Sequence, residues 1–94
     1  MVTLRIEHRI SNYEGWKQAF DSDPINRKRS GVRRFKIYRP VNDESYVIID
    51  LEFEILEQAQ AVETALHKIF GNIEGKLIFG AKTTILNIAE EAEL

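Results

Sequence analysis

Residues 2–10 read VTLRIEHRI, a stretch in which apolar and polar side chains alternate. The even-numbered positions are apolar apart from one histidine, and they are Val2, Leu4, Ile6, His8 and Ile10. Alternation with a period of two predicts a β-strand that buries one of its faces. His8 therefore stands on the face that this strand is expected to turn toward the core.

A helix is expected to follow this strand. Ser11 to Glu14 fits a capping box, in which the Ser11 hydroxyl accepts from the Glu14 amide and the Glu14 side chain reaches back. Aromatic residues then recur at helical spacing on the side that would face a core, and they are Tyr13, Trp16 and Phe20.

A second, short helix is predicted directly after the first. Asp23 and Pro24 suit an N-cap and the first helical position, and this basic segment would run to Ser30. Gly31 would end it, because glycine readily adopts the left-handed conformation at a helix C-terminus.

Two further strands form a predicted hairpin. Val32–Arg39 and Tyr46–Phe53 both alternate, and turn-forming residues at 40–45 connect them. Phe35 and Ile49 are placed on the apolar faces of these two strands.

The last third of the chain predicts a helix and a strand. Apolar residues recur at helical spacing over Leu56–Phe70, and Gly71 and Asn72 suit its end. Residues 72–81 give no firm assignment. Lys82–Ala89 alternates as a strand, for which we expect Leu86 to face the core and Ile85 to face outward.

The predicted element order is βαββαβ over a single domain, residues 1–94. Right-handed crossovers then place both main helices on one face of a four-stranded antiparallel sheet, which is the ferredoxin-like α+β arrangement.

The other sheet face would carry tyrosines and charges of both signs. It fits either a solvated sheet face or a homodimer interface, which must be self-complementary about a two-fold axis. In the second interpretation, Arg34 and Lys36 of one subunit would meet Asp50 and Glu52 of the other. The candidate interface residues are Arg34, Lys36, Tyr38, Tyr46, Asp50 and Glu52.

Several stretches resemble the dimeric α/β-barrel superfamily. The run Tyr13–Asp21, YEGWKQAFD, is similar to a DYxxWKxxFD signature, and GVRR at 31–34, RPVND at 39–43 and YVIIDLEF at 46–53 resemble the same group. The superfamily includes antibiotic-biosynthesis monooxygenases, and the similarity is greatest to small proteins of uncharacterised chemistry. The resemblance implies that two ferredoxin-like subunits pair through their sheets into a barrel.

His8 is the candidate catalytic residue. The resemblance implies a cavity between sheet and helices, and an imidazole that lines it could act as acid, base or hydrogen-bond donor near neutral pH. A structural histidine bonded to a loop carbonyl is the alternative. The candidate pocket residues are Tyr13, Trp16, Phe20, Phe35 and Ile49.

No cofactor is expected. His8 and His67 are far apart in the sequence, lack the spacing of metal ligands, and Cys is absent. Haem-degrading barrel relatives use a helix histidine as the iron ligand, but the strand tryptophan pattern of those enzymes is missing here, so haem is not predicted.

The charges are segregated along the chain. Residues 27–39 hold seven basic side chains and no acid, and residues 43–63 hold seven acids and no base. RNA-recognition modules share the element order, but the strand at 46–53 lacks their glycines and carries Asp50 and Glu52. We therefore expect no nucleic-acid partner, no membrane segment and, without Cys or an export signal, a cytoplasmic location.

Two functional hypotheses remain open. The first is a cofactor-independent oxygenase- or isomerase-like enzyme for a small aromatic or polycyclic molecule, with His8 as its polar group. The second is a non-catalytic small-ligand-binding module or a structural dimer.

Overall fold

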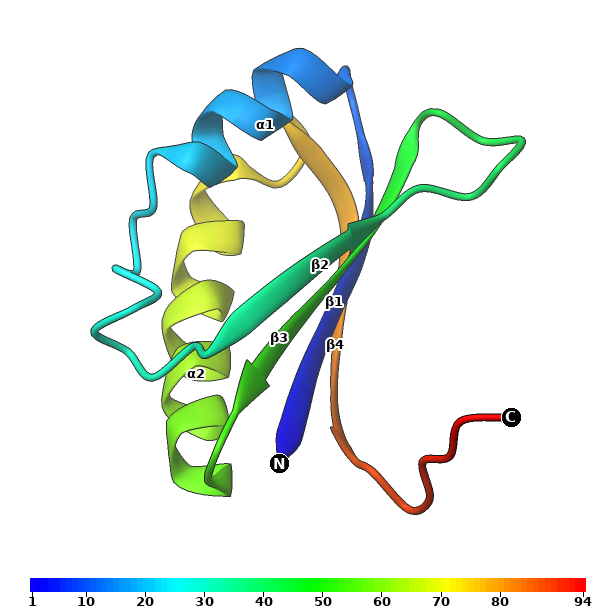
Figure 1. Ribbon diagram of the computed structural model, residues 1–94. Coiled ribbons are helices and arrows are strands. Elements are labelled where there is room, and N and C mark those ends of the chain that lie inside the picture. Colours follow the sequence, from blue (N-terminus) through cyan, green and yellow to red (C-terminus); the bar gives the residue numbers. More distant parts are fainter.

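The computed structural model describes residues 1–94, and its elements follow the predicted order (Figure 1). They are β1 (Val2–Ile10), α1 (Tyr13–Asp21), β2 (Arg34–Tyr38), β3 (Tyr46–Phe53), α2 (Leu56–Ile73) and β4 (Ile78–Asn87). The strands form one antiparallel sheet in the order β2-β3-β1-β4, and both helices lie on the same side of it. The predicted ferredoxin-like α+β fold is confirmed. Neither helix is long and apolar enough to span a lipid bilayer.

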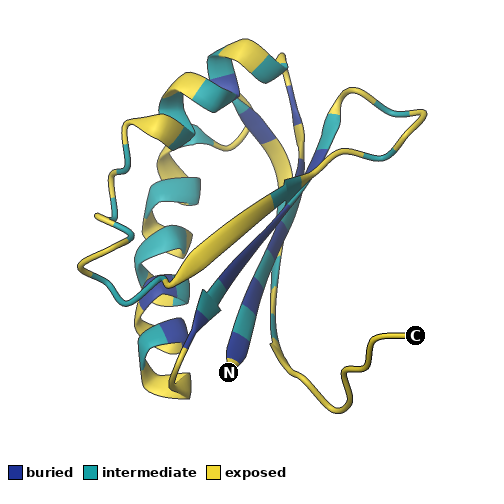
Figure 2. Cartoon of the chain, viewed as in Figure 1, coloured by how far each residue is buried: buried dark blue, intermediate teal, exposed yellow.

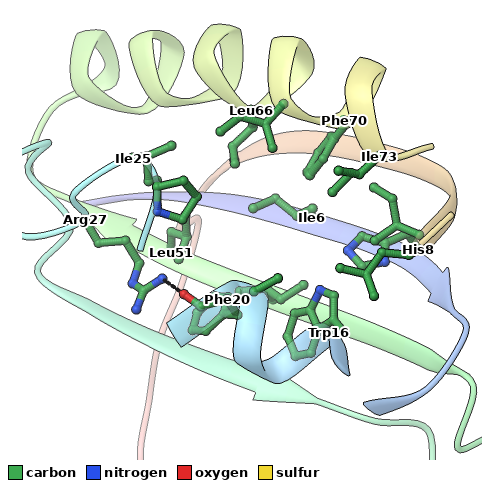
Figure 3. Close-up of a pocket in the computed structure, with 16 residues that line it drawn as sticks. Ile6, His8, Trp16, Phe20, Ile25, Arg27, Leu51, Leu66, Phe70 and Ile73 are labelled. Carbon is green, nitrogen blue, oxygen red and sulfur yellow. Dashed lines mark hydrogen bonds between the residues drawn. The ribbon is translucent and has the colours of Figure 1, made fainter. Parts of the chain in front are cut away.

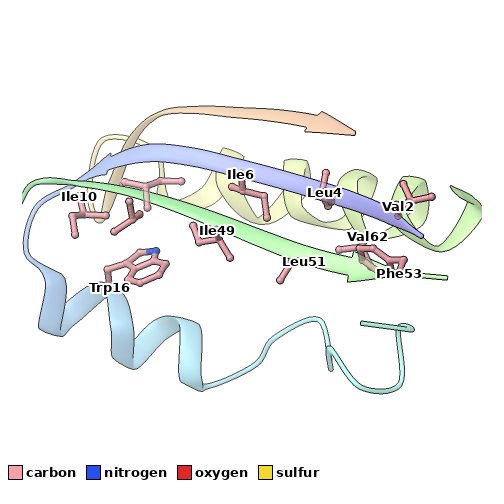
Figure 4. Close-up of a cluster of buried hydrophobic side chains, with 12 residues drawn as sticks. Val2, Leu4, Ile6, Ile10, Trp16, Ile49, Leu51, Phe53 and Val62 are labelled. Atoms are coloured by element: carbon pink, nitrogen blue, oxygen red, sulfur yellow. The ribbon is translucent and has the colours of Figure 1, made fainter. Parts of the chain in front are cut away.

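The core lies between the sheet and the helices. In the central strand pair, Leu4 faces Leu51 and Ile6 faces Ile49, so paired residues send their side chains to the same side. These side chains are buried together with Trp16 of α1 (Figure 4). The buried positions concentrate in β1 and β3, whereas β2 is largely exposed (Figure 2).

The N-cap of α1 lies one residue later than the sequence predicts. Asn12, and not Ser11, is the N-cap: its backbone is extended and its Oδ1 accepts a hydrogen bond from the Gly15 amide at 2.7 Å. An asparagine cap bonds the amide three residues on, as a serine would, so the two neighbouring candidates differ only in where the helix begins.

The predicted second helix does not form. Residues 22–33 make a series of turns between α1 and β2. Asp23 and Asn26 both have left-handed backbones, with φ of 55° and 51°. Asx side chains tolerate this conformation and bond nearby amides, as Asp23 Oδ1 does with the Arg27 amide at 2.8 Å. Gly31 does adopt a positive φ, of 100°.

The hairpin is close to its prediction. β3 has the predicted bounds, and β2 is shorter, beginning at Arg34 and ending at Tyr38. The antiparallel pairing of the two strands aligns Ile37 with Ile49.

The segment after α2 differs from the prediction at both of its ends. The helix continues through Gly71 and ends at Ile73, and β4 begins at Ile78 inside the range that had no assignment. The faces of β4 are also reversed. Ile85 pairs with the buried Leu4 and packs against the core, whereas Leu86 pairs with Thr3 on the open face.

A β-bulge interrupts the pairing of β1 with β4 beside His8. Glu7 faces Lys82 and Arg9 faces Phe79, so two residues of β4 oppose His8. One of them is Gly80, whose φ of 67° suits the glycine position of a bulge.

Candidate functional site

A cavity of about 100 Å³ lies between the inner sheet face and the two helices (Figure 3). Of the 16 residues that line it, 13 are hydrophobic. They come from β1, β3, the first residue of β4, both helices and the turns that follow each helix. The only polar side chains among the 16 are those of His8 and Arg27.

His8 is held at this cavity by its strand and by one hydrogen bond. The residue is only 2% exposed, because the alternation of β1 turns it inward with Ile6 and Ile10. Its Nδ1 lies 3.1 Å from the carbonyl oxygen of Arg9. That oxygen can only accept, so Nδ1 carries the proton and Nε2 of the neutral ring has a free lone pair. Nε2 makes no hydrogen bond within the chain.

The imidazole is enclosed by aromatic rings. Trp16 and Phe70 both stand edge-on to it, each with its ring centroid 6.0 Å from that of the imidazole. Burial in these surroundings lowers the pKa of His8, while the bond to the Arg9 carbonyl and the charge of Glu74 act in the opposite direction. The neutral form, which can accept a proton, is therefore the favoured form at neutral pH.

The proposed pocket residues divide into two groups. Trp16, Phe20 and Ile49 line the cavity together with His8. Tyr13 and Phe35 are not among the residues that line it.

Tyr13 packs beneath the Arg39 guanidinium, whose carbon lies 4.3 Å from the ring centroid, at the outer side of α1. Phe35 is 44% exposed on the edge strand β2, with its ring edge-on to Phe20 at 5.1 Å. Both residues lie on the expected elements. Their side chains, however, pack on the side of the lining residues that faces away from the cavity.

Arg27 is the polar lining residue that the sequence does not single out. Its guanidinium carbon lies 4.0 Å from the Phe20 ring centroid, and Nη1 donates to the Phe20 carbonyl at 2.7 Å. The sequence predicts a short basic helix followed by a strand here, so no single arginine stands out. Its i,i+4 spacing to Asp23 was the available signal, since Asp23 accepts from the Arg27 amide and lies 3.5 Å from Nη1.

The charges on the open sheet face are paired within one subunit. Arg5 donates to both carboxylate oxygens of Asp50, at 2.8 and 2.9 Å, and Arg34 Nε lies 3.0 Å from Glu52. Asp50 and Glu52 therefore have basic partners within their own chain, and the pairing of Arg34 and Lys36 with Asp50 and Glu52 across a two-fold axis stays a prediction. Lys36 makes no ion pair within the chain.

Tyrosines and aliphatic residues complete this face. The Tyr46 hydroxyl donates to Glu7 at 2.7 Å, which raises the pKa of Tyr46. Tyr38, Phe79 and Leu86 are large apolar side chains that remain exposed.

The other histidine lies apart from the cavity. His67 Nε2 lies 3.0 Å from the Thr83 hydroxyl, which in turn donates to Glu63 at 2.8 Å and ties α2 to β4. The structure holds no cluster of three or more His, Asp or Glu side chains arranged to bind a metal ion.

The fold is shared with solved structures at low sequence identity. No known protein-family profile and no curated protein matches the sequence. The chain is similar to SnoaB, a cofactor-independent oxygenase from Streptomyces nogalater, with a TM-score of 0.73 and 10% identity over 96% of this chain and 94% of that one.

Two further structures show the same similarity. A dimeric ferredoxin-like protein from an uncultured marine organism has a TM-score of 0.69 and 13% identity, with both chains covered completely. MhuD, in a structure with two manganese protoporphyrin IX molecules per active site, has a TM-score of 0.70 and 18% identity over 99% of each chain.

Proposed function

We propose that this protein binds a small molecule of about one ring in the cavity beside His8, and that His8 acts on it as a general base. The observation that carries the proposal is the free Nε2 of a buried, neutral imidazole at an otherwise apolar cavity. A ligand that donates an O–H or N–H to Nε2 would satisfy the open lone pair of this nitrogen.

The size of the cavity supports a single ring over a polycyclic molecule. Its volume is about 100 Å³, and an apolar cavity of about 150 Å³ accommodates benzene. Sites for drug-sized molecules typically measure about 300–1,000 Å³. A phenol therefore suits this site better than a fused-ring substrate does.

The reaction class follows from what the side chains can do. His8 in its neutral form can take a proton from a phenol, which leaves an electron-rich phenolate. That species is the starting point for either an oxygenation, with dioxygen as co-reactant, or an isomerisation. The similarity in fold to a cofactor-independent oxygenase agrees with oxygenation. Because one fold supports many reactions, the proposed reaction rests on the residues of the site.

No cofactor is proposed, and a porphyrin in particular does not fit this site. The cavity is smaller than a porphyrin, and its one histidine uses Nδ1 for the Arg9 carbonyl and is packed between Trp16 and Phe70. His67 is tied to Thr83 instead.

The test separates binding from chemistry. Phenol and toluene are titrated into the protein while the Trp16 and His8 resonances are followed by NMR, and dioxygen uptake is then measured with dihydroxybenzenes. We expect phenol to bind more tightly than toluene in the native protein, and His8→Gln to abolish uptake but not ring binding. His67→Gln is the matched control and should change neither. If neither ring perturbs the cavity resonances, the proposal fails.

The protein is further proposed to act as a homodimer through its open sheet face. Exposed Tyr38, Phe79 and Leu86 lie on that face with Lys36, which lacks an intrachain partner. Aromatic residues on a surface of mixed charge are typical of protein–protein interfaces. Sedimentation equilibrium should give about twice 10.9 kDa, and Leu86→Glu should shift the population to the monomer. A monomer at millimolar concentration would end this proposal and favour the solvated-face alternative.

A further inference from the structure

We propose that the ligand of this cavity is anionic, with a carboxylate or a similar acidic group that binds Arg27 while its ring reaches toward His8. The inference rests on the proposed function, because it takes the cavity as the binding site and specifies what enters it.

The two polar lining residues lie far apart along the cavity. Figure 3 shows Arg27 and His8 at opposite ends of the row of apolar side chains that includes Leu51, Ile6 and Phe70. A ligand in this cavity therefore meets a cation at one end and a neutral proton acceptor at the other. A molecule with an acidic group and a hydroxyl on opposite sides of one ring matches both ends.

Arg27 borders both the cavity and a separate surface hollow between the 22–33 turns and the start of β2. The basic side chains of that hollow are Arg27, Lys28, Arg33 and Arg34, and its one acid is Asp23. Arg33 pairs with Glu54 and Arg34 with Glu52, so the positive charge without an acidic partner in this hollow is that of Lys28, beside Arg27. A concave surface with an excess of one sign raises the local concentration of counter-ions, here of anions. An anion that reaches Arg27 from this hollow is therefore favoured over a neutral molecule.

Arg27 retains hydrogen-bonding capacity for a ligand. A guanidinium has five N–H donors, and Arg27 donates to the Phe20 carbonyl through Nη1. Asp23 lies 3.5 Å from the same Nη1, beyond a short hydrogen bond, and its Oδ1 already accepts from the Arg27 amide. Nε and Nη2 make no hydrogen bond in the chain. These two nitrogens can bind a carboxylate, and the side chain needs little ordering because Phe20 and Phe35 already stack against it.

The stacking of Arg27 on Phe20 also explains why arginine suits this end of the cavity. A planar guanidinium can lie flat on Phe20 and keep its edge free for an anion, which a lysine ammonium cannot do as well. At this end of the cavity, Arg27 therefore presents a guanidinium that packs on Phe20 through its face and offers its cationic edge to a ligand.

The experiment compares 4-hydroxybenzoate with 4-hydroxybenzamide, which has the same shape without the charge. Dissociation constants are measured by NMR titration at about pH 7.5, where the acid is ionised. We expect the benzoate to bind about tenfold more tightly or better, and to shift the Arg27 Nε–H resonance while the benzamide does not. Arg27→Met should remove this preference, and Arg29→Met, its matched control at an exposed position that lines neither the cavity nor the hollow, should keep it.

The outcomes separate the two proposals. Equal affinity for the two compounds, or a preference that survives Arg27→Met, overturns the anionic ligand while the neutral ring still supports the cavity as a binding site. Failure of both compounds to perturb the cavity resonances rejects the proposed function as well. Should Arg27→Met unfold, the Nε–H shift of the native protein decides the question alone.

Discussion

The imidazole of His8 on β1 stands edge-on to the ring of Phe70 on α2, with the two centroids 6.0 Å apart. This contact joins the sheet to the second helix at the cavity, and it places a titratable group where water has little access. The stability of the fold and the chemistry of the site therefore depend on the same side chain.

The first prediction concerns pH. Because burial lowers the pKa of His8 below its usual value of about 6.5, the unfolded chain binds a proton before the folded chain does. The stability that neutral His8 contributes is thus present above about pH 6.5 and is lost as pH falls toward the pKa of the folded state. Urea unfolding at a series of pH values should show this decline, and His8→Gln should reduce it. An unchanged slope in that variant would contradict the assignment.

The second prediction concerns the core beneath the sheet. Leu4→Ala removes a fully buried side chain and should lower the free energy of unfolding by about 2–5 kcal/mol. Leu56→Ala is the same change at an exposed position in the first turn of α2, and it should stay within about 0.5 kcal/mol. Denaturant unfolding measures both, and similar losses would show that the core is misplaced.

The third prediction uses one substitution at two glycines. Gly31 has a φ of 100°, and a Cβ there would lie 2.6 Å from Cδ of Gln58, so Gly31→Ala should destabilise the fold by about 1–3 kcal/mol. Gly71 lies within α2 and has open space around it, so Gly71→Ala should stabilise the fold by about 0.5–1 kcal/mol. Thermal unfolding distinguishes the two by the sign of the shift.

The fourth prediction tests the cap of α1. Asn12→Ala removes the acceptor of the Gly15 amide and should cost about 0.5–2 kcal/mol, whereas Asn12→Asp should retain most of the stability. Ser11→Ala should have little effect. The reverse ranking would restore the capping box that the sequence suggested.

The sequence was sufficient to predict the two strands in the middle of the sheet. β1 and β3 alternate over their whole length because each has one face on the core, and both have the predicted bounds. The edge strand β4 was harder, since Ile85 and Leu86 are neighbours of similar hydrophobicity. Only its pairing with β1 decides that Ile85 turns inward, and such long-range pairing leaves no local pattern.

The candidate site was predictable only in part, because not every residue of the site leaves a local pattern in the sequence. His8 stood out because a polar residue interrupts an apolar face, which is a local signal. Arg27 gave no such signal, because its role depends on turns in which Asp23 and Asn26 adopt left-handed backbones. Asp23 followed by Pro24 is equally compatible with a helix start, so the sequence pattern favoured the wrong structure there.

The bulge opposite His8 has a consequence for how the chain can change in length. Across Phe79–Lys82, β4 holds one residue more than the facing part of β1. Deleting Gly80 would remove only the extra residue, so Phe79 would stay opposite Arg9 and the buried Ile78 opposite Ile10. Loss of a single residue elsewhere in β4 would instead exchange its inner and outer faces. Descendants of this protein should therefore be able to lose one residue in this short segment, as they can in the turn at 40–45, and keep the length of the rest of β4 unchanged.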